Sequence, residues 1–256
     1  MSTMTIPSVT NSNGPTMQQS GPTTASTRKT AVLVGLLFLT ATVAFIFANA
    51  LTTGVLSRPD FLTGASTDAN ALATGALLLS GQFAVVGIAV LLFPLLKPYS
   101  EPVALAHVGF RVGELAASLF YLAVPLLAIE LGAGLRDGTV DASVSTSLSA
   151  LLQAQHSVAI VMIYLVTSVA GMCMASLLYR SRLIPRWIAI LGVIGYPALF
   201  VGCILDMFNV VDVAQGVGLI ALVPGGLFEL ILPIWLIAKG FTFPGHGSGR
   251  VAATPA

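Results

Sequence analysis

Three ionisable side chains interrupt long apolar stretches of this sequence: Arg111, Glu114 and Glu229. A guanidinium group is a permanent cation with five N–H donors, and a carboxyl group accepts hydrogen bonds or carries a proton. In apolar surroundings such groups are costly unless they are paired or face water. The trio therefore leaves three hypotheses. It forms a structural ion pair that locks two helices together, lines a polar cavity that binds a small anion or a proton, or faces an oligomer partner.

Further polar residues fall near these three. At about 1.5 Å per helical residue, the trio lies roughly 12–16 Å from one membrane face, and Ser168 and Tyr196 lie roughly 14–17 Å from it. Polar residues at intervals of four, three, four and three form one helix face: His107, Arg111, Glu114, Ser118 and Tyr121. The candidate intramembrane site comprises His107, Arg111, Glu114, Ser168, Tyr196 and Glu229.

The composition indicates which elements hold these residues. Only 11 basic and 10 acidic residues stand among 256, and 56% of the chain is hydrophobic. The mean hydropathy is +0.94. So few charges cannot cover a water-soluble surface, and a net charge of +1 argues against nucleic-acid binding. The chain is therefore expected to be a polytopic protein whose main partner is the lipid bilayer.

Six apolar stretches are each long enough to cross a membrane, which takes about 20 residues. They are Ala31–Val55, Ala71–Leu96, Val103–Leu131, Ser157–Tyr179, Trp187–Met207 and Val217–Ala238. Because the apolar runs are continuous rather than alternating, they predict helices and not strands. The expected fold is an all-α integral membrane protein with six transmembrane helices, and its oligomeric state stays open.

The expected domain organisation has three parts: a disordered tail over 1–28, a six-helix transmembrane domain over 29–241 and a second disordered tail over 242–256. The tails are rich in Ser, Thr, Pro and Gly and cannot form a core. Ala48-Asn49-Ala50 has the small-x-small form of a signal cleavage site. The preceding apolar run is longer than a signal h-region of about 7–15 residues, so an uncleaved first helix is expected.

Lys and Arg predict the orientation, because cytoplasmic loops carry an excess of them. With the N-terminus inside, eight fall on the inner side and two, Arg58 and Arg136, on the outer side. The inner eight are Arg28, Lys29, Lys97, Arg180, Arg182, Arg186, Lys239 and Arg250. Both termini are therefore expected in the cytoplasm and the protein in the cytoplasmic membrane.

Two segments leave local alternatives open. Ser143–Gln155 has apolar residues at helical spacing, so it either extends the fourth helix outward or lies on the membrane surface. In the sixth span, Pro224-Gly225-Gly226 precedes Glu229 and Pro233 follows it. This span is expected to be a kinked helix, or a broken one whose freed backbone groups line a site.

Three motifs together resemble a known bacterial family. They are Phe110–Glu114 (FRVGE), Leu178–Trp187 (LYRSRLIPRW) and Glu229–Gly240 (ELILPIWLIAKG). The chain resembles the membrane-protein family catalogued as domain of unknown function 4386 over about residues 28–241. The resemblance implies a six-helix integral membrane protein, and it implies neither an activity nor catalytic residues.

Signatures of common enzymes are missing from the sequence. It contains no GxSxG, HExxH or P-loop motif. Cys173 and Cys203 sit singly in apolar runs, and His107 and His156 lie near opposite membrane faces, too far apart to hold one haem. No cofactor and no metal are expected. The first hypothesis is a small-solute or proton carrier with a polar ligand. The alternatives are a sensory or scaffolding membrane subunit and an intramembrane enzyme acting on a lipid.

Overall fold

The computed structural model describes residues 24–213 and 215–242, and every regular element in these ranges is helical. The elements are α1 (Thr24–Leu56), α2 (Phe61–Gly64), α3 (Ala69–Leu79), η1 (Ser80–Gln82), α4 (Phe83–Leu96), α5 (Glu101–Arg136), η2 (Ala142–Val144), α6 (Ser145–Ser181), α7 (Arg186–Met207), η3 (Gly216–Leu222) and α8 (Val223–Ala238).

The predicted tails fall largely on 1–23 and 243–256, which lie outside the described residues. Residues 24–28, expected to belong to the first tail, form the start of α1 instead. No Gly or Pro stands between Thr24 and Gly35, so nothing in this segment stops the apolar helix from extending toward the N-terminus.

Six helical stretches are long and apolar enough to cross a membrane. They are α1, α3 with η1 and α4, α5, η2 with α6, α7, and η3 with α8. Each contains one of the six predicted spans. Helices satisfy their own backbone hydrogen bonds in hydrocarbon. The prediction of an all-α, multi-pass membrane protein with six transmembrane helices is therefore confirmed.

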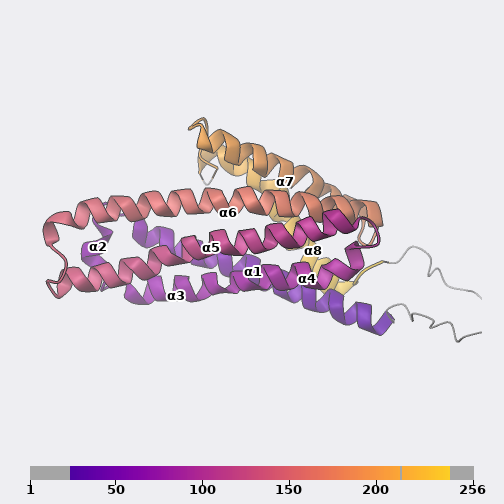
Figure 1. Ribbon diagram of the computed structural model, residues 1–256, viewed down its shortest axis with the longest axis horizontal. Helices are drawn as coiled ribbons and strands as arrows, with labels where there is room; N and C mark the ends of the chain where they lie inside the picture. Colours follow the sequence, from indigo (N-terminus) through magenta and orange to yellow (C-terminus); the bar gives the residue numbers. More distant parts are fainter. Residues whose placement is uncertain (1–23, 214, 243–256) are drawn as a thin grey trace, which may run out of the picture.

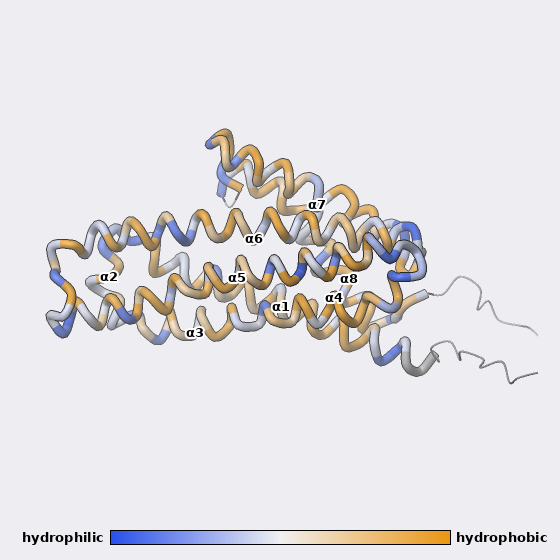
Figure 2. Tube along the Cα trace, viewed as in Figure 1, coloured by the Kyte–Doolittle hydropathy of each residue, from blue (hydrophilic) through white to orange (hydrophobic). Residues whose placement is uncertain are grey.

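The six spans form a closed ring. Going round it, α1 packs on α3 and α4, these pack on α5, then α5 packs on α6, α6 on α7, α7 on α8, and α8 on α1. Figure 1 shows α5 and α6 running along the length of the molecule while α7 leans away from them. Figure 2 shows mostly apolar positions along the helices and hydrophilic positions at the turns, with further hydrophilic positions inside α5 and along α6. Side chains that point inward from any of the six spans therefore meet in the interior of this ring.

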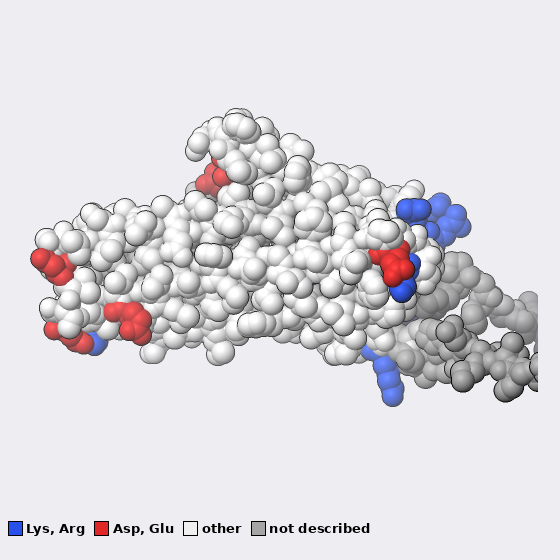
Figure 3. All heavy atoms as spheres, viewed as in Figure 1, with Lys and Arg blue, Asp and Glu red and all other residues white. Residues whose placement is uncertain are grey.

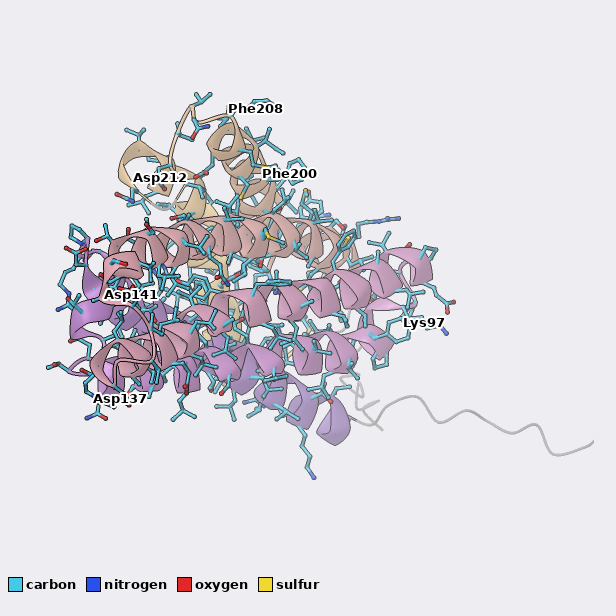
Figure 4. All side chains as sticks on the ribbon, turned by 60° about the vertical axis from the view of Figure 1, so that its left-hand side comes forward. Lys97, Asp137, Asp141, Phe200, Phe208 and Asp212 are labelled. Atoms are coloured by element: carbon cyan, nitrogen blue, oxygen red, sulfur yellow. The ribbon has the colours of Figure 1, made fainter. Side chains whose placement is uncertain are left out.

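The two ends of the molecule differ in charge. In Figure 3, Lys and Arg gather at the end where α1 begins and α8 finishes, and most of the visible acidic groups lie elsewhere. Figure 4 places Lys97 at this basic end and Asp137 and Asp141 at the opposite, acidic end. There the backbone N–H of Ser143 donates to Asp141 (2.8 Å) and lowers the pKa of its carboxyl group. On the face seen in Figure 3, the surface between the ends is nearly free of charges apart from acidic groups near the free end of α7, as expected for a protein surrounded by lipid.

Two helices are much longer than the bilayer requires. α5 has 36 residues and α6 has 37, about 55 Å each, against a hydrocarbon core of about 30 Å. α7 has only 22 residues, and Figure 1 shows α5 and α6 running past its free end. On the overshooting part of α6, Gln153 donates to the carbonyls of Leu56 (2.6 Å) and Arg58 (3.0 Å). Ser143–Gln155 thus extends the fourth span outward instead of lying flat on the membrane.

Three spans contain a 3₁₀ element, and in the fourth span this is the short η2 that precedes α6. The short 3₁₀ element η1 joins α3 to α4, and the last span begins as the 3₁₀ element η3 and becomes α8 at Val223. Pro224 follows immediately, then Gly225 and Gly226. Proline lacks the N–H that a preceding turn would bind, so the transition falls where the sequence predicts an irregular span. Pro233 lies inside α8 without ending it.

Glycines allow close contacts around α7. A Cβ atom built on Gly195 would lie 2.3 Å from the backbone nitrogen of Gly225 on α8. A Cβ atom built on Gly171 of α6 would lie 2.3 Å from the ring of Tyr196. Small residues let membrane helices approach at backbone distance, so these two positions fix how α7 sits against its neighbours.

Replacing Gly195 by Ala should destabilise the protein by roughly 1–3 kcal/mol, because its methyl group meets backbone atoms that cannot rotate away. Thermal unfolding of the detergent-solubilised protein, followed by circular dichroism, measures this loss. Gly109→Ala is the matched control, because a Cβ on Gly109 would meet nothing within 4 Å. Equal unfolding midpoints for Gly195→Ala and the parent would contradict the close contact.

Candidate functional site

One face of α5 carries the polar residues that the sequence predicts to share a side. All five are buried: His107, Arg111, Glu114, Ser118 and Tyr121. The neighbours of α5 in the ring are α3, α4 and α6, so this face points into the bundle and not toward lipid. The helical period thus brings charged groups to the centre of an apolar protein.

Arg111 and Glu114 form a buried ion pair. The Nη1 atom of Arg111 lies 2.7 Å from Oε2 of Glu114, and the two residues are 3% and 4% exposed. The pair joins positions three apart on one helix, where side chains are neighbours. The guanidinium also lies 5.9 Å from the ring centroid of Phe38 on α1. Because both partners belong to α5, the expected lock between the third and sixth spans is not formed by this ion pair.

Glu229 on α8 has a different partner. Its Oε1 atom accepts a hydrogen bond from the hydroxyl group of Tyr196 on α7 (3.1 Å). Among the described residues, the ion pairs are Arg58–Asp68, Lys97–Glu101, Arg111–Glu114 and Arg136–Asp137. Glu229 is therefore held by a neutral phenol and not by a cation.

A cavity of about 180 Å³ lies between these groups, enough for several water molecules or a small solute. All six spans contribute to its lining. Its polar lining residues are Thr42, Gln82, Arg111, Glu114, Tyr164, Thr167, Tyr196 and Glu229. The apolar lining includes the rings of Phe38 and Phe45 on α1. The closed ring of helices thus surrounds a cavity whose polar groups are set in mostly apolar, partly aromatic walls.

Four of the six predicted site residues line this cavity and two do not. Arg111, Glu114, Tyr196 and Glu229 are in the lining. His107 is buried, and its Nδ1 atom lies 2.9 Å from the carbonyl of Ala170 on α6. Ser168 is buried too, but its hydroxyl group donates to the carbonyl of Leu165 in its own helix (2.6 Å). These two residues bind backbone groups beside the cavity.

The prediction missed four neutral polar lining residues: Thr42, Gln82, Tyr164 and Thr167. On α6 the residue that faces the cavity is Thr167 and not its neighbour Ser168, because one residue turns a helix by about 100°. Gln82 reaches the cavity from η1. A buried amide in the middle of an apolar span was the one signal in the sequence that could have identified it.

Hydrogen-bonding capacity remains unused inside the cavity. The Nε and Nη2 atoms of Arg111 and the Oγ1 atom of Thr167 are buried without a hydrogen-bond partner in the described protein. Buried donors are costly unless something satisfies them. The guanidinium therefore keeps N–H groups that no described residue satisfies, and its ion-pair partner is Glu114.

The charges of the cavity do not balance. Its lining holds one cation, Arg111, and two carboxyl groups, Glu114 and Glu229. Glu114 and the guanidinium neutralise each other at 2.7 Å. Glu229 is left as an additional acid at the depth of the hydrocarbon core, where a net charge is expensive.

A second polar cluster, the outer cluster, lies toward the acidic end and consists of Asn49, Thr53, Tyr121 and His156. The hydroxyl group of Tyr121 donates to Asn49, and the Nε2 atom of His156 lies 3.3 Å from Tyr121 and 3.4 Å from Thr53. Tyr121 is two helical turns beyond Glu114, about 10 Å. Of these four residues, only Tyr121 is predicted by the sequence to lie on the polar face of the third span.

Phe45 separates the outer cluster from the cavity. Its ring centroid lies 6.0 Å from that of Tyr121 and 6.2 Å from that of Tyr164. Phe45 and Tyr164 line the cavity, and Tyr121 belongs to the outer cluster. An aromatic layer thus divides the polar interior into two compartments.

Comparison with known proteins supplies a family but no activity. The family described as Domain of unknown function (DUF4386) matches residues 33–240, from the first span to just past the last. No curated protein and no solved structure matches the chain significantly. The family that the sequence motifs resemble is therefore the family that is found.

Replacing Arg111 by Leu should lower stability by roughly 3–5 kcal/mol, because Glu114 then stays buried without its cation. The double variant Arg111→Leu with Glu114→Leu removes both charges and should regain most of the loss. Unfolding midpoints in detergent measure both. Arg136→Leu, which breaks the exposed pair with Asp137, is the control and should leave the midpoint unchanged. A double variant as unstable as the single one would contradict pairing within α5.

Proposed function

The chain belongs to the DUF4386 family, and from the geometry of its cavity we propose that it is a membrane carrier with a proton-binding carboxyl group at Glu229. A small solute with a polar group occupies the cavity when the proton leaves. One observation carries this proposal. The cavity holds a surplus carboxyl group, because the only cation in its lining is already paired with Glu114.

The surplus acid supports exchange of two cationic species. A carboxylate left bare within hydrocarbon is unstable. When the cavity is sealed, Glu229 therefore holds either a proton or a cationic group of the solute. Tyr196 donates to Glu229 at 3.1 Å, which orients the carboxyl group toward either occupant. Two mutually exclusive occupants of one site are what a coupled carrier requires.

The helix irregularities support movement around this site. Gly225 and Gly226 line the cavity together with Glu229, just after the last span changes from η3 to α8. Gln82 lines it from η1, the 3₁₀ turn within the second span. Discontinuous helices surround the substrate sites of many transporters, and 3₁₀ turns within helices mark hinges. Each of these 3₁₀ segments reaches the cavity with its last residue, Leu222 in η3 and Gln82 in η1.

The alternative roles receive less support. A purely structural or scaffolding subunit gives no reason for a cavity with a surplus carboxyl group beside a complete ion pair. For a lipid-modifying enzyme, the described lining offers neither a cysteine nor a histidine beside its threonines.

The orientation belongs to the same proposal. The bias of eight basic residues against two favours the cytoplasmic membrane with the basic end and both termini in the cytoplasm. Glu229 would then lie about 15 Å from the cytoplasmic face, counted along α8 from Lys239. The outer cluster would lie beyond the aromatic layer, toward the external side.

Cysteine labelling tests this orientation. In a background without Cys173 and Cys203, Asp137→Cys at the acidic end should react with a membrane-impermeant maleimide added to intact cells. Lys97→Cys at the basic end should react only after the cells are permeabilised. Labelling of Lys97→Cys in intact cells would reverse the proposed orientation.

A carboxyl reagent tests the proton site. Dicyclohexylcarbodiimide partitions into bilayers and reacts with protonated carboxyl groups, so it should modify Glu229 in the full-length protein in liposomes. Peptide mass spectrometry locates the adduct, and modification should slow as the pH rises. Glu229→Gln should abolish it. Glu130→Gln, an exposed acid on α5 outside the cavity lining, is the matched control and should retain it. An unmodified Glu229, or a reaction directed at Glu114, would contradict the proposal.

A further inference from the structure

The cavity opens sideways between α1 and the last span. Arg111 and Glu114 are almost fully buried, so they form its floor. Two other lining residues are exposed: Ile46 on α1, at 52%, and Gly226 on α8. A Cβ atom built on Gly226 would meet nothing within 4 Å. Glu229, one helical turn from Gly226, is half-buried and therefore lies close to this opening.

The opening lies at the depth of the lipid chains. Counted at 1.5 Å per residue, Gly226 is about 18 Å from Ala238 and Ile46 about 22 Å from Ala31, both within a hydrocarbon core of about 30 Å. Toward the basic end the two helices close on each other, since a Cβ atom built on Gly35 would lie 2.8 Å from a backbone carbonyl of α8. A molecule using this opening therefore comes from the bilayer and not directly from water.

The walls next to the opening favour a particular chemistry. The rings of Phe45, Tyr164 and Tyr196 line the cavity around Glu229, and aromatic faces attract cations. An anion would add to the surplus negative charge, whereas a single positive charge cancels it. An apolar body can remain in contact with the exposed side chain of Ile46 while the charged group reaches the carboxylate.

We infer that the solute exchanged for the proton on Glu229 is a hydrophobic organic cation, an ammonium group with an apolar body, which enters from the bilayer between Ile46 and Gly226. The inference rests on the proposed function for the surplus charge, and it adds the class of solute and its route. The O–H bond of the Glu229 carboxyl group breaks, a water molecule in the cavity accepts the proton, and the carboxylate pairs with the ammonium group. No other bond changes.

Binding to the full-length protein in lipid nanodiscs tests this inference, with empty nanodiscs as the baseline in isothermal titration calorimetry. Three probes separate the requirements: hexyltrimethylammonium, tetramethylammonium with the same head and no chain, and hexanesulfonate with the same chain and opposite charge. Hexyltrimethylammonium should bind at least about tenfold more tightly than tetramethylammonium, because its chain is buried. Hexanesulfonate should give no heat above the baseline.

Variants locate the site and its opening. Glu229→Gln should weaken hexyltrimethylammonium binding at least about tenfold, since the ammonium group loses its counter-charge at the depth of the hydrocarbon core, and Glu130→Gln should not. Gly226→Leu fills the opening and should weaken binding or slow it. Gly109→Leu places the same side chain at another exposed helix glycine that has no neighbours and should have no effect. Size-exclusion profiles and helical circular dichroism check that each variant is folded.

The outcomes separate this inference from the proposed function. Equal affinity for both ammonium probes, preference for hexanesulfonate, or no binding at all would overturn the organic-cation inference even if carbodiimide modifies Glu229. Binding that depends on Glu229 but releases no proton would support the cation site and overturn the proton step. Binding unaffected by Gly226→Leu would overturn the route from the bilayer.

Discussion

A guanidinium group in hydrocarbon must be neutralised close by, and this constraint at Arg111 determines how the rest of the interior is used. The chain meets it within one helical turn, with Glu114 at 2.7 Å. Because the pair is complete inside α5, no other span has to supply a counter-charge. Glu229 is then free to take Tyr196 as its partner, and α7 and α8 form a polar contact of their own. The cavity exists where these two independent polar contacts face each other across the ring.

The sequence predicts the spans well because hydrocarbon requires every crossing segment to be long, apolar and helical. It also predicts the buried face of α5, since the period of a helix puts Arg111, Glu114 and Tyr121 on one side. The choice between Glu114 and Glu229 as the partner of Arg111 depends on how α5 and α8 are placed in space. The depth of a residue along its span does not show which of the two acids lies next to Arg111. The same limitation explains Ser168, which has the right depth and faces a backbone carbonyl of its own helix.

The residues of the cavity lining that the sequence did not predict are all uncharged. Thr42, Tyr164 and Thr167 are common enough in membrane helices that none stands out without a structure, and only the amide of Gln82 within an apolar span offered a signal. The outer cluster depends on α1, α5 and α6 meeting, because Asn49, Tyr121 and His156 are far apart in the chain. Phe45 gains its position between two polar compartments only from its contacts with Tyr121 and Tyr164. Such relations arise from tertiary packing and leave no local pattern.

The unequal lengths of the helices have a consequence for the surrounding lipid. One side of the ring presents α5 and α6, with 36 and 37 residues, and another presents α7, with 22. Hydrophobic mismatch costs fractions of a kcal/mol per Å, so lipids beside α7 set the level of the bilayer and the ends of the long helices stand out of it. Because the helices on the two sides differ in length, the tilt of the protein depends on the thickness of the membrane. A thicker bilayer is mismatched with the short α7 before it is mismatched with α5 and α6. α8, which holds Glu229, packs against α7 and lies on this side of the ring.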